Sequence, residues 1–340
     1  MSSGALSPLD DIRALAFLPA PDHLDAIAQT DGREAALTKP PGALGKLEAI
    51  SRWLTEVTGK APPKVAQPRV VVFAANHGIA EEGVSAYPAS VNAQMLAAFR
   101  DGKAAINQIC STNGIGLSVF DLAVDVPSGN IAREDAFTSA RELAGTMAFG
   151  LEAVAGGVDC LGLGEMGIGN TSVAAAIFAA LHGGDVADWC GAGTGVEGPA
   201  LARKAAVVER AVKRVEGERD PLILLQRIGG REIAAMTGAI LAARTQKIPV
   251  VVDGFVSTAA AALVHALSHD AISHCIFAHR SAEKAHGRAL QAMGVHPLLD
   301  LGMRLGEGTG AALAMGIIKA AAACHSGMAT FQEAGVDGPQ

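Results

Sequence analysis

The 340-residue chain is poor in aromatic and charged residues, and its cationic side chains do not cluster. Aromatic residues make up 4% and charged residues 18% of the sequence, and the formal net charge is −7. Nucleic-acid binding needs clustered Lys and Arg to neutralise phosphates, so we expect no nucleic-acid partner. No apolar run reaches the ~18 residues of a membrane span, and the N-terminus lacks the pattern of a signal peptide. We therefore expect a cytoplasmic protein without a membrane span.

Disulfides and metal sites are not expected either. The five cysteines are odd in number and form no CxxC pair, which argues against a disulfide framework or a structural zinc site. The sequence has no HExxH and no P-loop. Four histidines lie close together in the sequence, but no acidic residue completes a plausible ligand set with them: His265, His269, His274 and His279. We expect no metal and no cofactor.

Glycine, in contrast, is abundant, with 40 residues where ordinary usage of roughly 7% would give fewer. Short apolar runs that end in Gly-rich segments alternate with Ala- and Leu-rich stretches of helical spacing, such as 172–181 and 202–215. This alternation predicts an α/β fold, a doubly wound parallel sheet buried on both faces. The predicted strands are residues 69–75, 116–124, 158–163, 249–252 and 271–278.

Both chain ends look helical. We expect residues 1–60 and 305–340 to form a smaller helical domain, and residues 61–304 to form a large α/β substrate-binding domain. In such a sheet the loops after the strands form the site. The unusual residues of this chain cluster in those loops.

Residues 162–167 match GxGxxG, which is formally a dinucleotide fingerprint, although the charged Glu165 inside the turn is awkward. An oxidoreductase is therefore one alternative. The following residues, Glu165 to Thr171, offer a second interpretation, in which Asn170 or Thr171 caps a helix and the glycines form an anion site at its N-terminus. A tight turn without a ligand is equally consistent with the pattern.

The loop 191–195, GAGTG, is followed by Lys204, which suits a phosphate held near a point charge. Taken alone, Lys204 would more often be a solvated helix residue. Glu307 lies between two glycines just before the apolar helix predicted at 311–318, so it is expected in a pocket wall or as a simple helix cap. The helix dipole would favour its ionised form, and burial would raise its pKa. His77 and His279, at strand ends, either contact a ligand or hold a loop.

Seven segments, in order, resemble the nicotinate-nucleotide:dimethylbenzimidazole phosphoribosyltransferase family of cobalamin assembly. They run over nearly the whole chain, from about Thr38 to Phe331, and seven ordered matches are far more specific than one Gly-rich loop. The segments are Lys39–Glu48, Asn76–Pro88, Gly164–Ser172, Gly191–Val196, Val251–Ser257, Ser281–Gly287 and Leu305–Met315.

The resemblance implies a doubly wound sheet, a helical domain built from both chain ends and a homodimer. It implies small-molecule substrates: nicotinate mononucleotide as phosphoribosyl donor and 5,6-dimethylbenzimidazole or a related base as acceptor. It implies Glu307 as the catalytic base and Glu165 as a second acid near the ribose. The other implied roles are phosphate and ribose binding by Gly167, Asn170, Gly193, Lys204 and Ser281, a benzimidazole pocket of Tyr87, Met95 and Met166, and a loop-fixing or ribose-binding role for Asp253.

The sequence departs from the family pattern at Asn76, where many members have Asp before His-Gly, so a negative charge is lost at that position. The chemistry agrees with a lone carboxylate base, because a pyridinium nitrogen leaves as a neutral ring and only the acceptor must lose a proton. A non-catalytic nucleotide sensor on the same fold is the second alternative.

Overall fold

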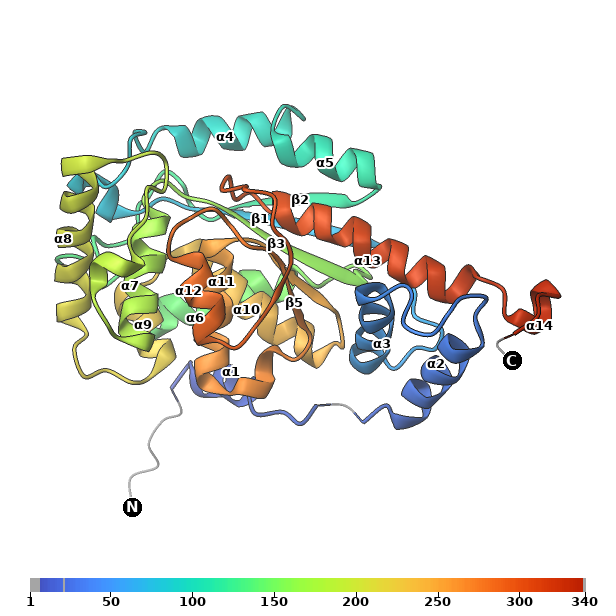
Figure 1. Ribbon diagram of the computed structural model, residues 1–340. Helices are drawn as coiled ribbons and strands as arrows, with labels where there is room; N and C mark the ends of the chain where they lie inside the picture. The colour runs from blue at the N-terminus through green and yellow to red at the C-terminus, as the bar shows by residue number, and fades with distance from the viewer. Residues whose placement is uncertain (1–6, 21, 339–340) are drawn as a thin grey trace, which may run out of the picture.

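The computed structural model describes residues 7–20 and 22–338. Six strands form one parallel sheet in the order β2-β1-β3-β4-β5-β6 (Figure 1), which confirms the predicted fold class. The strands are β1 (Pro68–Ala74), β2 (Gly116–Asp121), β3 (Cys160–Met166), β4 (Val250–Val252), β5 (Cys275–His279) and β6 (Pro297–Leu299).

The strand predictions differ from the structure by up to three residues at the ends of β2 and β3, and by more in two places. The predicted strand 271–278 begins too early, because residues His269–Ile272 form a short 3-10 helix, η3, before β5. The edge strand β6 was missed, because it has only three residues, begins with proline and pairs only with β5. Such a short segment carries no alternating pattern that a sequence could show.

Alternate side chains of the strands point to opposite faces, and each face is covered by helices. In β1, Val71 and Phe73 join one core, whereas Val70 and Val72 join the other. The first core includes α6 (Ala140–Glu152), α7 (Asn170–His182), α10 (Arg231–Thr245) and α11 (Phe255–Leu267). The second includes α3 (Lys46–Thr58), α5 (Ala105–Asn113) and α13 (Thr309–Gly327).

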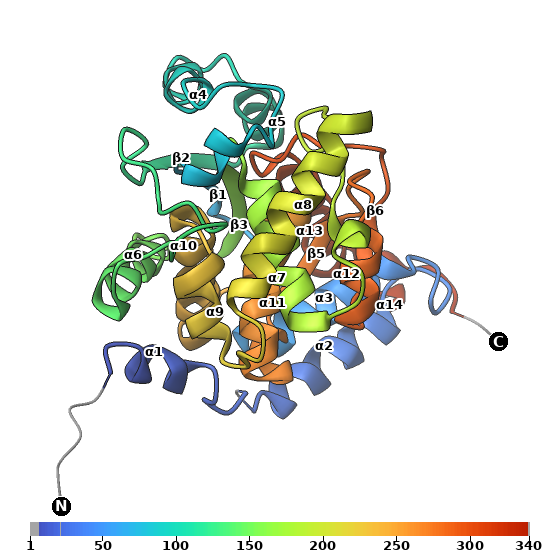
Figure 2. The ribbon, with the colours of Figure 1, turned by 90° about the vertical axis from the view of Figure 1, so that its left-hand side faces the viewer.

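The remaining helices surround these layers (Figure 2). Three of them pack outside α7 and α11: α8 (Gly198–Arg214), α9 (Pro221–Ile228) and α12 (His286–Ala292). The helix α4 (Val91–Arg100) packs against β2, and two short 3-10 helices, η1 (Gly78–Glu82) and η2 (Val186–Trp189), lie in loops. None of the helices in the described ranges is both long and apolar enough to cross a bilayer.

Helices from both ends of the sequence lie side by side, as Figure 1 shows for α2 (Leu24–Ala36), α3 and the far end of α13. The Arg33 guanidinium donates to the carbonyls of His325, Ser326 and Met328, close to α14 (Phe331–Ala334). The first helix, α1 (Asp10–Leu15), packs instead on α10. The division into a domain of residues 1–60 and 305–340 and a domain of residues 61–304 stays a prediction.

Candidate active site

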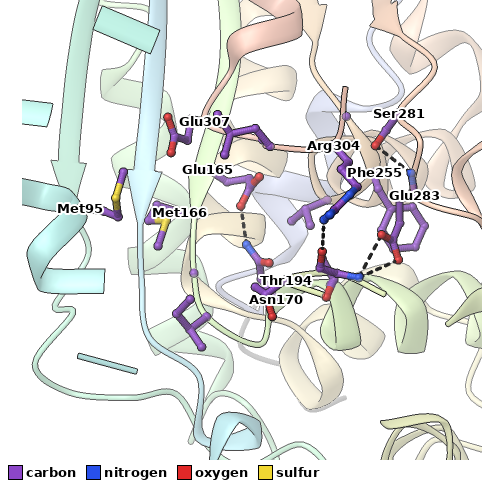
Figure 3. Close-up of a pocket in the computed structure, with 18 of the residues that line it drawn as sticks. Met95, Glu165, Met166, Asn170, Thr194, Phe255, Ser281, Glu283, Arg304 and Glu307 are labelled. Atoms are coloured by element: carbon purple, nitrogen blue, oxygen red, sulfur yellow. Dashed lines mark hydrogen bonds between the residues drawn. The ribbon is translucent and has the colours of Figure 1, made fainter. Parts of the chain in front are cut away.

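A cavity of about 680 Å³ opens at the carboxyl ends of the central strands (Figure 3). It has the size and position expected of a small-molecule site in a parallel sheet. The predicted site residues that line it come from strand β3, from helices and from several loops: Tyr87, Met95, Glu165, Met166, Gly167, Asn170, Gly193, Ser281 and Glu307. Lys204 and Asp253 do not line it.

Glu307 reaches the cavity from a strained turn. Its φ is 62°, and its neighbours Gly306 and Gly308 have φ values of 84° and 80°. A left-handed conformation costs a residue with a Cβ roughly 1–2 kcal/mol, and such strain is typical of functional positions. The turn rests on Gly164 of β3, where a Cβ would lie 2.6 Å from the Glu307 carbonyl oxygen. A glycine in the strand is therefore what lets the turn approach.

The Glu307 carboxylate is buried, and its Oε2 has no hydrogen-bond partner among the described protein atoms. Burial raises its pKa to about 7, although the backbone N–H of Ile106 opposes the shift. Of the two opposing effects that the sequence suggested for this residue, burial is therefore the larger. A carboxylate with this pKa and a free oxygen suits a general base near neutral pH.

Glu165, at the end of β3, is the second buried acid of the cavity. Its Oε2 accepts a hydrogen bond from Asn170 Nδ2. Burial and then the charge of Glu232 raise its pKa to about 8, with smaller contributions from Asp253 and Glu307. Glu165 therefore holds its proton at neutral pH more readily than Glu307 does.

Behind Glu165 lies a fully buried pair that the sequence did not suggest. The His77 Nε2 is 2.7 Å from Glu232 Oε1. His77 packs against Gly167 and Gly230, where a Cβ would lie 2.9 Å and 2.3 Å from the imidazole. Of the two roles considered for His77, the structure supports holding a loop. Glu232 lies within α10, where no sequence pattern distinguishes it from other helix residues.

The turn between β3 and α7 corrects one expectation. The N-cap of α7 is Gly169, and neither Asn170 nor Thr171 caps the helix. The Asn170 amide bonds to Glu165 instead, and Thr171 Oγ1 accepts from Lys204.

Lys204 is fully buried, so it is not a solvated helix residue. Its Nζ donates to Thr171 Oγ1 and to the Gly191 carbonyl, both at 2.9 Å. Burial lowers its pKa, and the charge of Glu283 opposes that shift. Lys204 thus ties the loop 191–195 to the start of α7 from behind the cavity.

Asp253, directly after β4, is also buried behind the cavity. Its carboxylate accepts from the backbone N–H groups of Ala311 at 2.8 Å and Gly308 at 3.2 Å. Burial raises its pKa to about 7, and these N–H groups oppose the shift. Asp253 therefore satisfies the first N–H groups of α13 and fixes the Glu307 turn.

Asn76 stands before His77 where many family members have Asp. Two hydrogen bonds of its amide side chain account for an Asn at this position. Its Oδ1 accepts from the His77 backbone N–H at 2.9 Å, and its Nδ2 donates to the Val124 carbonyl at 3.1 Å. An ionised Asp would have no hydrogen to donate to that carbonyl.

The cavity has two chemically different ends, which Figure 3 shows side by side. Met95 and Met166 lie at one end, close to Glu165 and Glu307. Tyr87 adds an aromatic ring that is 55% exposed at the rim. Polar groups lie at the other end: Thr194, Ser281, Glu283 and Arg304. Asn170, bonded to Glu165, lies between the two ends.

Sequence reasoning missed Thr194, Phe255, Glu283 and Arg304 of this lining. Glu283 follows β5 in a Ser-Ala-Glu segment, and Arg304 precedes the Glu307 turn by three residues. Their position in loops after strands was the available signal.

The dinucleotide interpretation of residues 162–167 is not supported. Gly162 and Gly164 lie within β3 rather than in the turn after it. A Cβ at Gly162 would lie 2.9 Å from Val70 Cγ2 and 3.3 Å from Ala311 Cβ. These glycines make room for α13, not for a pyrophosphate.

The four nearby histidines do not gather at one site. His265 and His269 stack with ring centroids 4.2 Å apart, His274 bonds to the Ile240 carbonyl, and His279 lines the cavity. Within residues 7–20 and 22–338, no three His, Cys, Asp or Glu side chains form a group that could hold a metal ion.

Comparisons with known proteins point to one family. A family model described as Phosphoribosyltransferase matches residues 19–336. The chain is similar to two proteins named nicotinate-nucleotide–dimethylbenzimidazole phosphoribosyltransferase. The one from Sinorhizobium fredii (strain NBRC 101917 / NGR234) is 58% identical, covering 99% of both chains. The one from Methylocella silvestris (strain DSM 15510 / CIP 108128 / LMG 27833 / NCIMB 13906 / BL2) is 58% identical, covering 98% of this chain and 97% of its own.

Among solved structures, the chain is similar to CobT from Thermus thermophilus, with a TM-score of 0.87 and 39% identity over 93% of this chain and 100% of that one. Because the family model and these relatives each span nearly the whole chain, the protein is an enzyme that belongs to the nicotinate-nucleotide–dimethylbenzimidazole phosphoribosyltransferase family.

Proposed function

We propose that this enzyme transfers the phosphoribosyl group of nicotinate mononucleotide to 5,6-dimethylbenzimidazole or a related base, giving α-ribazole 5′-phosphate and nicotinate. The observation that carries the proposal is the Glu307 carboxylate, buried and with a free oxygen, at the methionine-lined end of a two-ended cavity. The names of the relatives support the same reaction.

The flat apolar acceptor lies between Met95, Met166 and Tyr87, with its N–H toward Glu307. Its other ring nitrogen attacks the anomeric carbon while the bond to the pyridinium nitrogen breaks. The bonding electrons leave with nicotinate as a neutral ring, and the acceptor proton passes to Glu307. A positioned base of this kind contributes roughly 10²–10⁴ to the rate. Attack from the face opposite to the leaving group converts the β donor into an α product.

Glu165 holds its proton near neutral pH because its pKa is about 8. In that form it donates a hydrogen bond to the ribose and places no second negative charge beside Glu307. Asn170 orients it. The raised pKa of Glu165 also keeps two ionised carboxylates from competing for one proton.

The donor phosphate lies at the polar end, with Gly167, Gly193 and Ser281 in contact and Lys204 behind the loop. Backbone N–H groups at such loops bind anions without a basic surface. Asp253 acts through the turn that it fixes.

The proposal extends to a homodimer in the cytoplasm, as the family resemblance suggests. Large apolar side chains such as Phe17, Leu24 and Phe149 are 61%, 69% and 48% exposed, and a subunit interface would cover such groups. Light scattering on the purified protein measures the mass directly, and a monomer would contradict this part.

The deciding experiment follows nicotinate release and α-ribazole 5′-phosphate formation by chromatography, with and without 5,6-dimethylbenzimidazole. Base-dependent formation of both products supports the proposal. Nicotinate release without a ribosylated base indicates a nucleotide hydrolase. Absence of both products across benzimidazoles, purines and phenols favours the nucleotide sensor, and tight binding of a reduced nicotinamide cofactor would favour the oxidoreductase.

A further inference from the structure

The polar end of the cavity already holds an anion, and that anion is part of the chain. The Gly193 backbone N–H, which the proposed function assigns to the donor phosphate, donates to the Glu283 carboxylate (Figure 3). We propose that the Glu283 carboxylate occupies the phosphate position of the 191–195 loop in the free enzyme. The substrate phosphate must then displace this carboxylate from the loop. This inference rests on the proposed function, because it concerns the phosphate end of the same site.

The contact between Glu283 and the loop is close and enclosed. Glu283 Oε2 lies 3.1 Å and Oε1 lies 3.4 Å from the Gly193 nitrogen, and the residue is 6% exposed. At Gly191 a Cβ would lie 1.7 Å from Glu283 Oε1. Only glycine at position 191 leaves enough space for the Glu283 carboxylate. The Glu283 backbone N–H donates to Ser281 Oγ at 3.2 Å. This bond holds Ser281, which also lines the cavity, in the same turn as Glu283.

The surroundings are built for negative charge. Lys204 is near enough for the charge of Glu283 to favour its protonated form. Arg304 donates to the Gly193 carbonyl at 2.9 Å, and Lys204 donates to the Gly191 carbonyl. The loop thus turns its carbonyl groups to two cations and its Gly193 N–H to the acid. This is the arrangement that a phosphate would use.

A phosphate and an ionised carboxylate cannot both occupy this place at low cost. Like charges in an enclosed site repel strongly, and the single Gly193 N–H makes only one strong bond. The entering phosphate therefore moves the Glu283 side chain away from the loop. Until then, Glu283 keeps the loop folded and lowers the affinity for small anions that make no other contact. A nucleotide also binds through its ribose and base, which offset the cost of this displacement.

Titration calorimetry with inorganic phosphate, without any acceptor base, tests the inference on three proteins. Glu283→Gln keeps the shape and an acceptor oxygen but removes the charge, so phosphate should bind at least about tenfold more tightly. The matched control is Glu197→Gln, which removes the same charge from an exposed residue close to the same loop. Its phosphate affinity should stay within about twofold of the original, because solvent screens exposed charges.

Equal or weaker phosphate binding by folded Glu283→Gln would overturn the inference, and so would the absence of measurable binding to every variant. A crystal structure of the unmodified enzyme with ribose 5-phosphate decides independently if the variant does not fold. The expected result is a phosphate oxygen on the Gly193 N–H and a displaced Glu283. A phosphate elsewhere, with Glu283 still on Gly193, refutes the displacement. Neither measurement uses turnover, so a failed transfer assay would sink the proposed reaction and leave this test intact.

Discussion

At the scale of single residues, Glu307 joins a strained backbone to a buried acid. Its left-handed φ of 62° carries the carboxylate into the cavity, and burial brings its pKa to about 7. An ordinary exposed glutamate would be ionised but too weak a base to accept the acceptor's proton efficiently at neutral pH. The strain and the pKa shift therefore both suit the proposed role of Glu307 as general base.

Glu307→Gln should lower kcat by roughly 10²–10⁴ and leave the dissociation constant of the donor nearly unchanged. Glutamine has nearly the size of glutamate and leaves the backbone strain unchanged. The loss of kcat therefore measures the missing base. Steady-state kinetics and donor-binding calorimetry measure the two quantities. Glu209→Gln, on the exposed face of α8, serves as the control. A variant with the original kcat would refute Glu307 as the base.

The pH dependence of kcat should report the same group. Because Glu307 works only when ionised and Glu165 only when protonated, kcat should rise with pH through about 7 and fall again above about 8. The residual activity of Glu307→Gln should lack this rise. If both proteins gave the same rising profile, the titrating group would be another residue.

At the scale of elements, the site depends on how closely α13 approaches β3. Gly162 and Gly164 leave room above the strand, and Asp253 ties the start of α13 to the end of β4. The Glu307 turn is thus held by two strands and one helix. A catalytic group on such rigid support keeps its position better than one on a free loop.

Gly164→Ala should displace the Glu307 turn, because the new Cβ would lie within 2.7 Å of the Glu307 carbonyl carbon and the Gly308 nitrogen. A misplacement of about 1 Å costs roughly 10² in rate, so kcat should fall by about that factor in a folded protein. Gly145→Ala is the control. This residue lies in α6 with nothing within 4 Å of its Cβ position, and alanine there should stabilise the helix by about 1 kcal/mol. Full activity in Gly164→Ala would contradict the packing argument.

Lys204→Met tests how α8 supports the 191–195 loop. The substitution leaves the buried Gly191 carbonyl without its donor, at a cost of about 1–3 kcal/mol, and frees the loop from α7. The melting temperature should fall and the donor KM should rise by at least about tenfold, with a smaller change in kcat. Lys213→Met on the same helix, where the lysine side chain is 69% exposed, should change neither. An unchanged donor KM would place the phosphate elsewhere.

At the scale of the whole molecule, the parallel sheet collects three buried acids with raised pKa values at one edge. Burial raises the pKa of Glu165 to about 8 and those of Asp253 and Glu307 to about 7. The folded state therefore binds protons that the unfolded chain releases above about pH 4.5. Stability from these groups is fully present below that pH and is lost as pH rises toward 7–8.

Glu165→Gln should remove part of this pH dependence. Between about pH 5 and about pH 8 its melting temperature should fall less than that of the original protein, because glutamine has no proton to lose. Differential scanning calorimetry at the two pH values measures both falls. Equal falls would mean that Glu165 titrates at an ordinary pKa.

The sequence predicted the fold more completely than it predicted the contacts within the site. The apolar runs predicted five of the six strands and the parallel sheet, because strands buried on both faces must be apolar throughout. The edge strand β6 and the 3-10 turn before β5 depend on contacts rather than on local pattern. Within the site, nine predicted residues line the cavity, and several of them, such as Gly167, Gly193 and Glu307, lie in Gly-rich turns.

By itself, the sequence determined the fold class, the family and the loops that line the cavity, because apolar periodicity and ordered glycine motifs are local properties of the chain. The tertiary structure alone decided which acids are protonated and which side chains meet. The pKa of Glu307 depends on its burial. The role of Lys204 depends on its bond to the Gly191 carbonyl, 13 residues away. The Gly193 N–H finds its carboxylate partner in Glu283, 90 residues along the chain. Such effects arise from desolvation and contact in three dimensions, which no stretch of sequence contains.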